Sequence, residues 1–142
     1  RPDIMLLIPT PTKQLVTVAV EVERTLKSVS RLQLKLRMFS RQSLLDGMIY
    51  ISESDTITEL VRRIYKERVV DTSKRISHYG NNFFLFSTWP LVTSECDVLL
   101  RNSSLEQTSL KHWIDELVAT KEGGRSDHGF KMRPSVGSHF PN

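Results

Sequence analysis

Residues 48–68 have the sequence MIYISESDTITELVRRIYKER, and this stretch predicts the centre of the fold. Met48–Ser52 is a short apolar run rich in β-branched and aromatic residues, which is typical of a strand. Over residues 55–68 apolar side chains recur at helical spacing, so this segment predicts an amphipathic helix. The apolar stripe of that helix consists of Ile57, Leu60, Val61, Ile64 and Tyr65. We expect Thr56 and Glu59 to form a capping box at its first turn.

The segment just before it, RLQLKLRMF at residues 31–39, alternates apolar and polar side chains. Strict alternation predicts a half-buried strand with one basic outer face. Together with Met48–Ser52 it predicts an antiparallel hairpin over residues 31–52, with the helix of residues 55–68 packed across it.

The N-terminal part contains one extended segment and one segment that fits either a helix or a strand. Residues 1–12 hold a short apolar run bounded by prolines, which predicts a strand or a docking arm. Residues 13–30 fit two patterns. Alternate valines favour a strand, whereas one apolar helical face and a threonine cap at Thr10 favour a helix, toward which the prediction leans.

Three further elements follow the helix of residues 55–68. Residues 83–87 and 96–101 predict strands. Residues 104–120 predict a second helix, begun by a capping box of Ser103 and Glu106 and ended by Gly123-Gly124. The last eighteen residues predict a tail, with at most a short strand at 129–133.

The segment SESDTITELVRRI, Ser52–Ile64, resembles the junction between the second strand and the helix of ubiquitin-like domains. The resemblance covers about residues 31–101 and implies an α+β fold of the β-grasp (ubiquitin-like) type. Such a fold has a mixed sheet with one helix packed across it, here with a second C-terminal helix and extended terminal arms. The helix of residues 104–120 is more similar to the Ras-association branch of that superfamily. The expected divisions are an N-terminal arm with a helix or strand at 1–30, a ubiquitin-like domain at 31–120 and a C-terminal tail at 121–142.

Composition indicates a globular domain. The 142 residues are 39% hydrophobic and 25% charged, with a net charge of +4, and no apolar run reaches the ~18–20 residues of a membrane helix. Because the chain begins at Arg1, we expect it to be part of a longer product. The single cysteine, Cys96, excludes an internal disulfide framework and favours an intracellular, reducing compartment, most simply the cytoplasm or the cytoskeleton.

Motifs for catalysis or cofactor binding are absent from the sequence. It contains no phosphate-binding glycine loop and no nucleophile elbow. His112 and Glu116 have helical spacing, but without a third ligand nearby we expect an ordinary surface pair rather than a metal site. The sequence therefore predicts no enzyme, no cofactor and no metal.

The expected function is that of a non-catalytic protein–protein interaction or scaffold domain in a larger protein or assembly. A small GTPase of the Ras type is the alternative partner, to be met by strand pairing and basic side chains. A ribonucleoprotein or nucleic-acid-associated structural role is the second alternative, less favoured at this net charge. The predicted partner-binding residues are Lys35, Arg37, Arg41, Arg62, Arg63 and Trp89.

Overall fold

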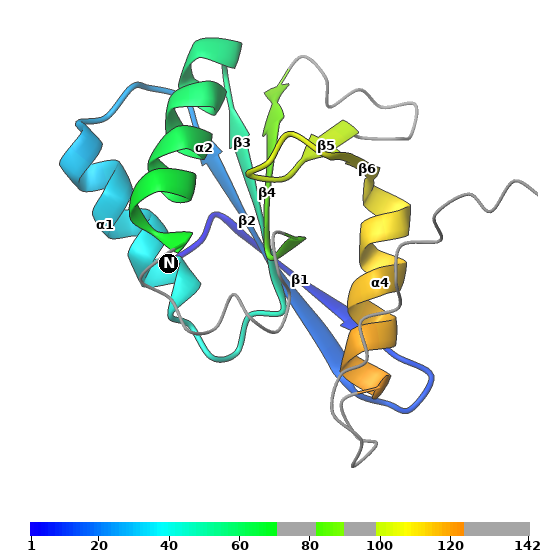
Figure 1. Ribbon diagram of the computed structural model, residues 1–142. Helices are drawn as coiled ribbons and strands as arrows, with labels where there is room; N and C mark the ends of the chain where they lie inside the picture. The colour runs from blue at the N-terminus through cyan, green and yellow to red at the C-terminus, as the bar shows by residue number, and fades with distance from the viewer. Residues whose placement is uncertain (71–81, 90–98, 124–142) are drawn as a thin grey trace, which may run out of the picture.

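The computed structural model describes residues 1–70, 82–89 and 99–123. These residues form a mixed six-stranded sheet whose strands lie in sequence order, with helices on both faces (Figure 1). The strands are β1 (Ile4–Pro9), β2 (Leu15–Glu23), β3 (Gly47–Ser52), β4 (Phe84–Thr88), β5 (Leu99–Arg101) and β6 (Gln107–Ser109). The central strands β2, β3 and β4 are parallel, and the outer pairs are antiparallel. The α+β class and the mixed sheet are therefore confirmed.

Two helices cover one face of the sheet and a third covers the other. α1 (Val29–Ser40) and α2 (Asp55–Arg68) contribute to one apolar cluster, whereas α4 (Leu110–Gly123) contributes to a second one (Figure 1). Two separate clusters arise because side chains of a strand alternate between the faces. β2 shows this clearly, since Val18 faces α4 and Ala19 faces α1.

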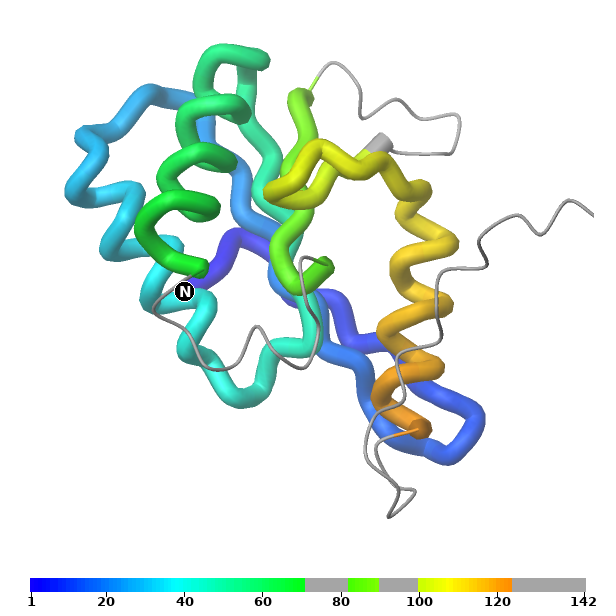
Figure 2. Tube along the Cα trace, viewed as in Figure 1, coloured from blue at the N-terminus to red at the C-terminus, as the bar shows by residue number. Residues whose placement is uncertain are grey.

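The N-terminal strand is confirmed and the helix favoured for residues 13–30 is wrong. Its valine-rich centre is β2, paired with β1 on one side and β3 on the other. The sequence of this segment fits both a helix and a strand. The strand forms because it pairs on both sides and both of its faces are buried. The turn between β1 and β2 reaches the end of α4, where the Thr12 amide donates to Glu122 Oε1 at 3.1 Å (Figure 2).

The strand predicted at residues 31–39 is also wrong, because this segment is helix α1. Ser28 caps it by accepting a hydrogen bond from the Arg31 amide. Leu32 and Leu36 lie one helical turn apart and are fully buried, whereas Leu34 is 71% exposed. Leucines at every second position contain the i, i+4 pairs of a helix, so the alternation did not distinguish the two structures. The predicted hairpin of residues 31–52 does not form; α1 is the crossover between the parallel strands β2 and β3.

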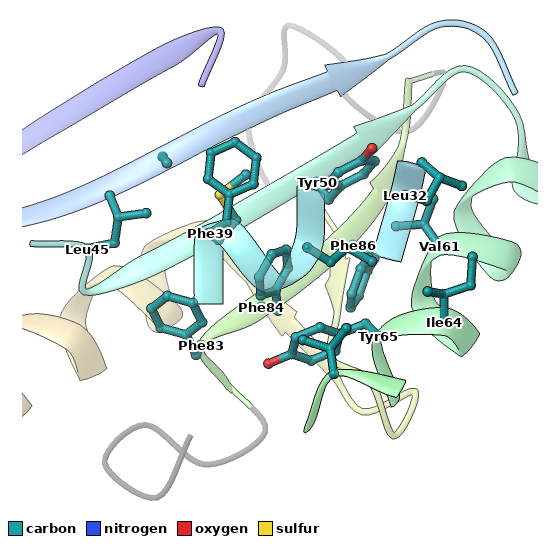
Figure 3. Packing of buried hydrophobic residues seen from close by; sticks show 14 residues of the cluster. Leu32, Phe39, Leu45, Tyr50, Val61, Ile64, Tyr65, Phe83, Phe84 and Phe86 are labelled. Carbon is teal, nitrogen blue, oxygen red and sulfur yellow. The ribbon is translucent and has the colours of Figure 1, made fainter. Parts of the chain in front are cut away.

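The strand at residues 48–52 and the helix at 55–68 are confirmed, with a different cap. Ser54 is the N-cap of α2 and accepts from the Ile57 amide, and Thr56 lies inside the first turn. The predicted apolar stripe packs on α1 and on the aromatic side chains of β4 (Figure 3). In that contact the Tyr65 ring lies 4.5 Å from the ring of Phe84.

The C-terminal elements are confirmed in kind, with shifted boundaries. β4 occupies the predicted strand at 83–87 and β5 the end of the one at 96–101. α4 begins at Leu110, after strand β6, and its first turn is capped by Ser109, whose Oγ accepts from the His112 amide at 3.1 Å. The predicted cap, Ser103, is instead buried in the turn between β5 and β6. Cys96, the predicted strand at 129–133 and the tail lie outside the described residues.

Candidate functional site

Polar side chains lie together at the end of the sheet where the parallel strands terminate, outside the two apolar clusters. We call this the carboxyl edge of the sheet. Parallel strands β2, β3 and β4 end there with Glu23, Ser52 and Thr88, each buried. Because β1 is antiparallel to β2, its first residues lie at the same edge. In open α/β sheets ligands bind outside the carboxyl ends of the strands, at the point where the strand order reverses. The strands of the described sheet lie in sequence order and α1 and α2 cover one face, so the case for a site here depends on its side chains.

At the end of β2 lies a group of five charged residues and one tyrosine that we call the β2-edge cluster. It consists of Asp3, Glu21, Glu23, Lys27, Lys35 and Tyr50. Glu21 and Glu23 are only 4% and 2% exposed. They occupy alternate positions of one strand and therefore point to the same face as Ala19, toward α1.

Lys35 of α1 reaches into this cluster. Its Nζ forms an ion pair with Glu21 Oε1 and lies 3.7 Å from Glu23 Oε2. Lys27 pairs with Glu23 at 3.0 Å. Buried charges persist only when they are paired, because their desolvation is costly. Two lysines therefore compensate two carboxylates that the fold has taken out of water.

Tyr50 of β3 ties the cluster to the middle of the sheet. Its hydroxyl donates to Glu23 Oε2 at 2.9 Å. Burial, followed by the negative charge of Glu23 and the hydrogen bond to it, raises the pKa of the Tyr50 hydroxyl. The hydroxyl consequently keeps its proton and stays a donor to Glu23 at neutral pH.

Within the part of the chain that the structure describes, two buried oxygens here have no hydrogen-bond partner, namely Glu21 Oε2 and Ser52 Oγ. Leaving a buried polar atom unsatisfied costs about 1–3 kcal/mol, and more for a charged group. Asp3 extends the β1–β2 ladder by one position beyond the pair Ile4↔Val20, which places it opposite Glu21. It is exposed and accepts from the Val22 amide at 2.8 Å. The Asp3 carboxylate is thus held at the amide next to Glu21, while the carboxylate of Glu21 is buried and paired with Lys35 through Oε1.

An open pocket of about 340 Å³ lies further along the same edge, at the end of β4. Asp55 Oδ1 accepts there from the Thr88 hydroxyl at 2.7 Å. Arg62 forms a two-pronged ion pair with Glu59 and also donates to the Ser103 carbonyl. The hydrogen bond from Arg62 lowers the pKa of Glu59, and the same bond raises the pKa of Arg62. These polar side chains form hydrogen bonds and ion pairs with one another. They therefore need a ligand less than Glu21 of the β2-edge cluster does.

The predicted partner-binding residues fall in several places rather than on one surface. Lys35 belongs to the β2-edge cluster, and Arg37 donates to the Arg68 carbonyl at the end of α2. Arg62 lines the pocket. The other three, Arg41, Arg63 and Trp89, are exposed. Their role in binding a partner stays a prediction.

The sequence analysis does not predict the β2-edge cluster, because the helix favoured for residues 13–30 separates Glu21 from Glu23 on the helix surface. Read as a strand, Glu21-Val22-Glu23 places two acids on one buried face, which is the signal that was available. His112 Nε2 lies 3.1 Å from Glu116 Oε1 on the exposed side of α4, the arrangement expected of a surface pair. Within the described ranges no three His, Cys, Asp or Glu side chains are already arranged to hold a metal ion, and no helix is long and apolar enough to cross a membrane.

Comparison of the chain with protein-family models, with curated proteins and with solved structures finds no match.

Proposed function

We propose that the β2-edge cluster is the centre of a phosphodiesterase that binds one divalent cation and hydrolyses a phosphodiester bond of a nucleic acid. The observation that carries the proposal is the buried carboxylate of Glu21 at the carboxyl end of β2, one oxygen of which has no hydrogen-bond partner among residues 1–70, 82–89 and 99–123. Charged side chains gathered where parallel strands end are candidates for a functional site.

The cation class follows from the available ligands. Asp3 and Glu21 supply carboxylate oxygens, which hard cations such as Mg²⁺ prefer. Mg²⁺ is commonly held by one or two carboxylates and completes its coordination with water and substrate phosphate. Two neighbouring carboxylates are therefore sufficient, and a cage of three protein ligands is not required.

Lys35 supplies the positive charge that the reaction needs. A cation bound at Glu21 would neutralise that carboxylate. Lys35 would keep Glu23 Oε2 at 3.7 Å as its partner, and its ammonium group would offer positive charge to a non-bridging phosphate oxygen, where negative charge accumulates in the transition state. In the reaction, water adds to phosphorus and the bond from phosphorus to one sugar oxygen breaks. That oxygen leaves as an alcohol with one proton of the water, and the other proton passes to solvent.

The substrate class follows from charge around the site. Exposed Arg1, Arg24 and Arg31 are close in sequence to Asp3, Glu23 and Lys35 respectively. Exposed Glu53, whose amide donates to the Glu23 carbonyl, lies at the same place, so three exposed arginines stand against the exposed acids Asp3 and Glu53. An excess of arginines would attract a polyanion. The net charge of +4 is compatible with contacts to a few phosphates.

A nicking assay tests the proposal. Supercoiled plasmid is incubated with the protein and Mg²⁺ or Mn²⁺, and relaxed and linear products are separated on a gel. We expect cation-dependent nicking that EDTA stops and that Glu21→Gln lowers by ~100-fold or more, in the range of a lost charge-stabilising group. The matched control is Glu59→Gln, an acid of α2 outside the cluster, which should cleave like the parent. Equal cleavage by the parent and by Glu21→Gln, or no cleavage by either, overturns the proposal.

A non-catalytic interaction domain is the second candidate function, as the sequence predicted. The observation that favours it is the exposed apolar surface of β1, developed in the next subsection. The ubiquitin-like assignment and the Ras-type partner stay predictions; neither proposal uses them, because residues 31–39 carried part of the resemblance as a strand and are a helix. A pull-down that captures a small GTPase equally in its GTP and GDP forms would remove that partner.

A further inference from the structure

Strand β1 leaves one side of its backbone unpaired within the described sheet, where it bonds only to β2. Its sequence, IMLLIP, contains no charged residue. Ile4, Met5 and Leu7 are 49%, 45% and 61% exposed. Natural edge strands are usually protected by lysines, bulges or a covering element, and an apolar edge without them pairs readily with another strand.

The hydrogen-bond pattern shows which backbone groups of β1 point outward. The Thr10 amide donates to the Gln14 carbonyl, so this pair is of the hydrogen-bonded type. In an antiparallel ladder the two types alternate, and the even residues of β1 therefore bond to β2. Thr17, an odd residue of β2, accepts from Asp46 on the side of β3, in agreement with this assignment. The N–H and C=O groups of Met5 and Leu7 thus point away from the sheet.

We propose that β1 pairs with β1 of a second copy of this chain, in antiparallel orientation about a twofold axis at Leu6. In this register each Met5 lies opposite Leu7 of the second copy, and both residues present outward N–H and C=O groups. Their side chains lie on the same face as Ala19, so the two copies form one continuous apolar patch there. Pro9, which has no N–H, lies opposite Asp3 and needs only to accept.

The absence of charge between Ile4 and Pro9 favours a second copy over an unrelated strand. A twofold pairing places identical strands opposite each other, and any charged residue near the axis would meet its own equivalent and repel it. β1 carries none, so its sequence is self-complementary. Pairing of the two β1 strands, each with six uncharged residues, joins the two sheets into one continuous sheet.

The test is the molar mass of the chain in solution, measured by light scattering after gel filtration over a range of concentrations. We expect a dimer that dissociates on dilution. Leu7→Lys places two like charges next to the axis and should raise the dissociation constant at least ~10-fold. Met5→Pro removes one outward N–H and leaves the ladder to β2 intact, so it should weaken the dimer as well. Leu34→Lys, an exposed leucine of α1, is the matched control and should leave the dimer unchanged.

Circular dichroism of each variant shows whether it is folded, and Met5→Pro and Leu7→Lys provide two independent tests. A chain that stays monomeric at several hundred micromolar overturns the proposal. A dimer that Leu34→Lys disrupts, or that both β1 variants leave intact, overturns it too. The nicking assay on Leu7→Lys separates this inference from the proposed function. Because Leu7 is outside the β2-edge cluster, this variant should lose the dimer and still nick plasmid like the parent.

Discussion

Replacing Lys35 by methionine tests whether the β2-edge cluster is a paired charge group inside the fold. Methionine keeps most of the aliphatic length of lysine and removes only the ammonium group. The change leaves Glu21 without its ion-pair partner and leaves Glu23 with Lys27 alone. Two buried carboxylates then repel each other with less compensation.

The magnitude follows from the distances. At an effective dielectric constant of ~20, two unit charges 3.7 Å apart, the separation of Lys35 Nζ and Glu23 Oε2, attract by about 4.5 kcal/mol. Part of this is offset by the desolvation of the lysine, whose side chain remains 21% exposed. Removal of one partner from a buried pair costs ~3–5 kcal/mol, so for this partly exposed lysine we expect a loss of ~2–4 kcal/mol.

Urea denaturation followed by circular dichroism at pH 7 measures this loss. The matched control is Lys66→Met, an exposed lysine of α2, for which we expect a change within ~0.5 kcal/mol. The double variant Glu21→Gln/Lys35→Met should recover ~1 kcal/mol or more relative to the sum of the single variants, because the pair is then removed as a unit. If Lys35→Met is as stable as Lys66→Met, the cluster is not a compensated buried group and our reasoning fails.

Three further predictions concern the fold. Gly47→Ala should destabilise the protein by ~1–3 kcal/mol and alter the near-ultraviolet signal of Trp113, because the added Cβ would lie 2.5 Å from Cζ2 of that ring; an unchanged melting curve would contradict the packing of α4. Ser54→Ala should cost ~1 kcal/mol by urea denaturation and Thr56→Ala much less, since Ser54 is the cap of α2; the reverse order would restore the capping box predicted from the sequence. Burial raises the pKa of Tyr50 and Tyr65. Above pH ~10 the unfolded chain loses these protons and the folded one keeps them, so stability falls by ~1.4 kcal/mol per pH unit for each tyrosine; Tyr50→Phe should make the fall shallower, and a slope equal to the parent's would refute the assignment.

The helix of residues 55–68 was predictable because only one structure fits its pattern. Its apolar stripe runs at i, i+3, i+4, i+7 and i+8, and an extended chain would scatter these residues over both faces. Residues 31–39 were not predictable in the same way. Leucines at every second position satisfy a strand, and their i, i+4 subset satisfies a helix. Only the packing of Leu32 and Leu36 against α2 and the sheet decides between the two.

The candidate site depended on the same ambiguity. Glu21 and Glu23 lie together only because they are on a strand, where alternate residues share a face. Lys35 reaches them only because it is on the helix that crosses above that face. A strand over residues 13–30 places the two acids on one face, so this half of the cluster is predictable from the sequence. Their partner Lys35 is not, because it lies twelve residues beyond Glu23 and its approach depends on the crossover geometry.

Binding of Mn²⁺, followed by electron paramagnetic resonance, tests the central claim most directly, because it requires neither a substrate nor turnover. The parent chain should bind one Mn²⁺, and Mg²⁺ should displace it. Glu21→Gln should weaken that binding by ~10-fold or more, whereas Glu59→Gln should bind like the parent. Equal affinity in the parent and in Glu21→Gln would contradict the assignment of a cation to the carboxyl edge of β2.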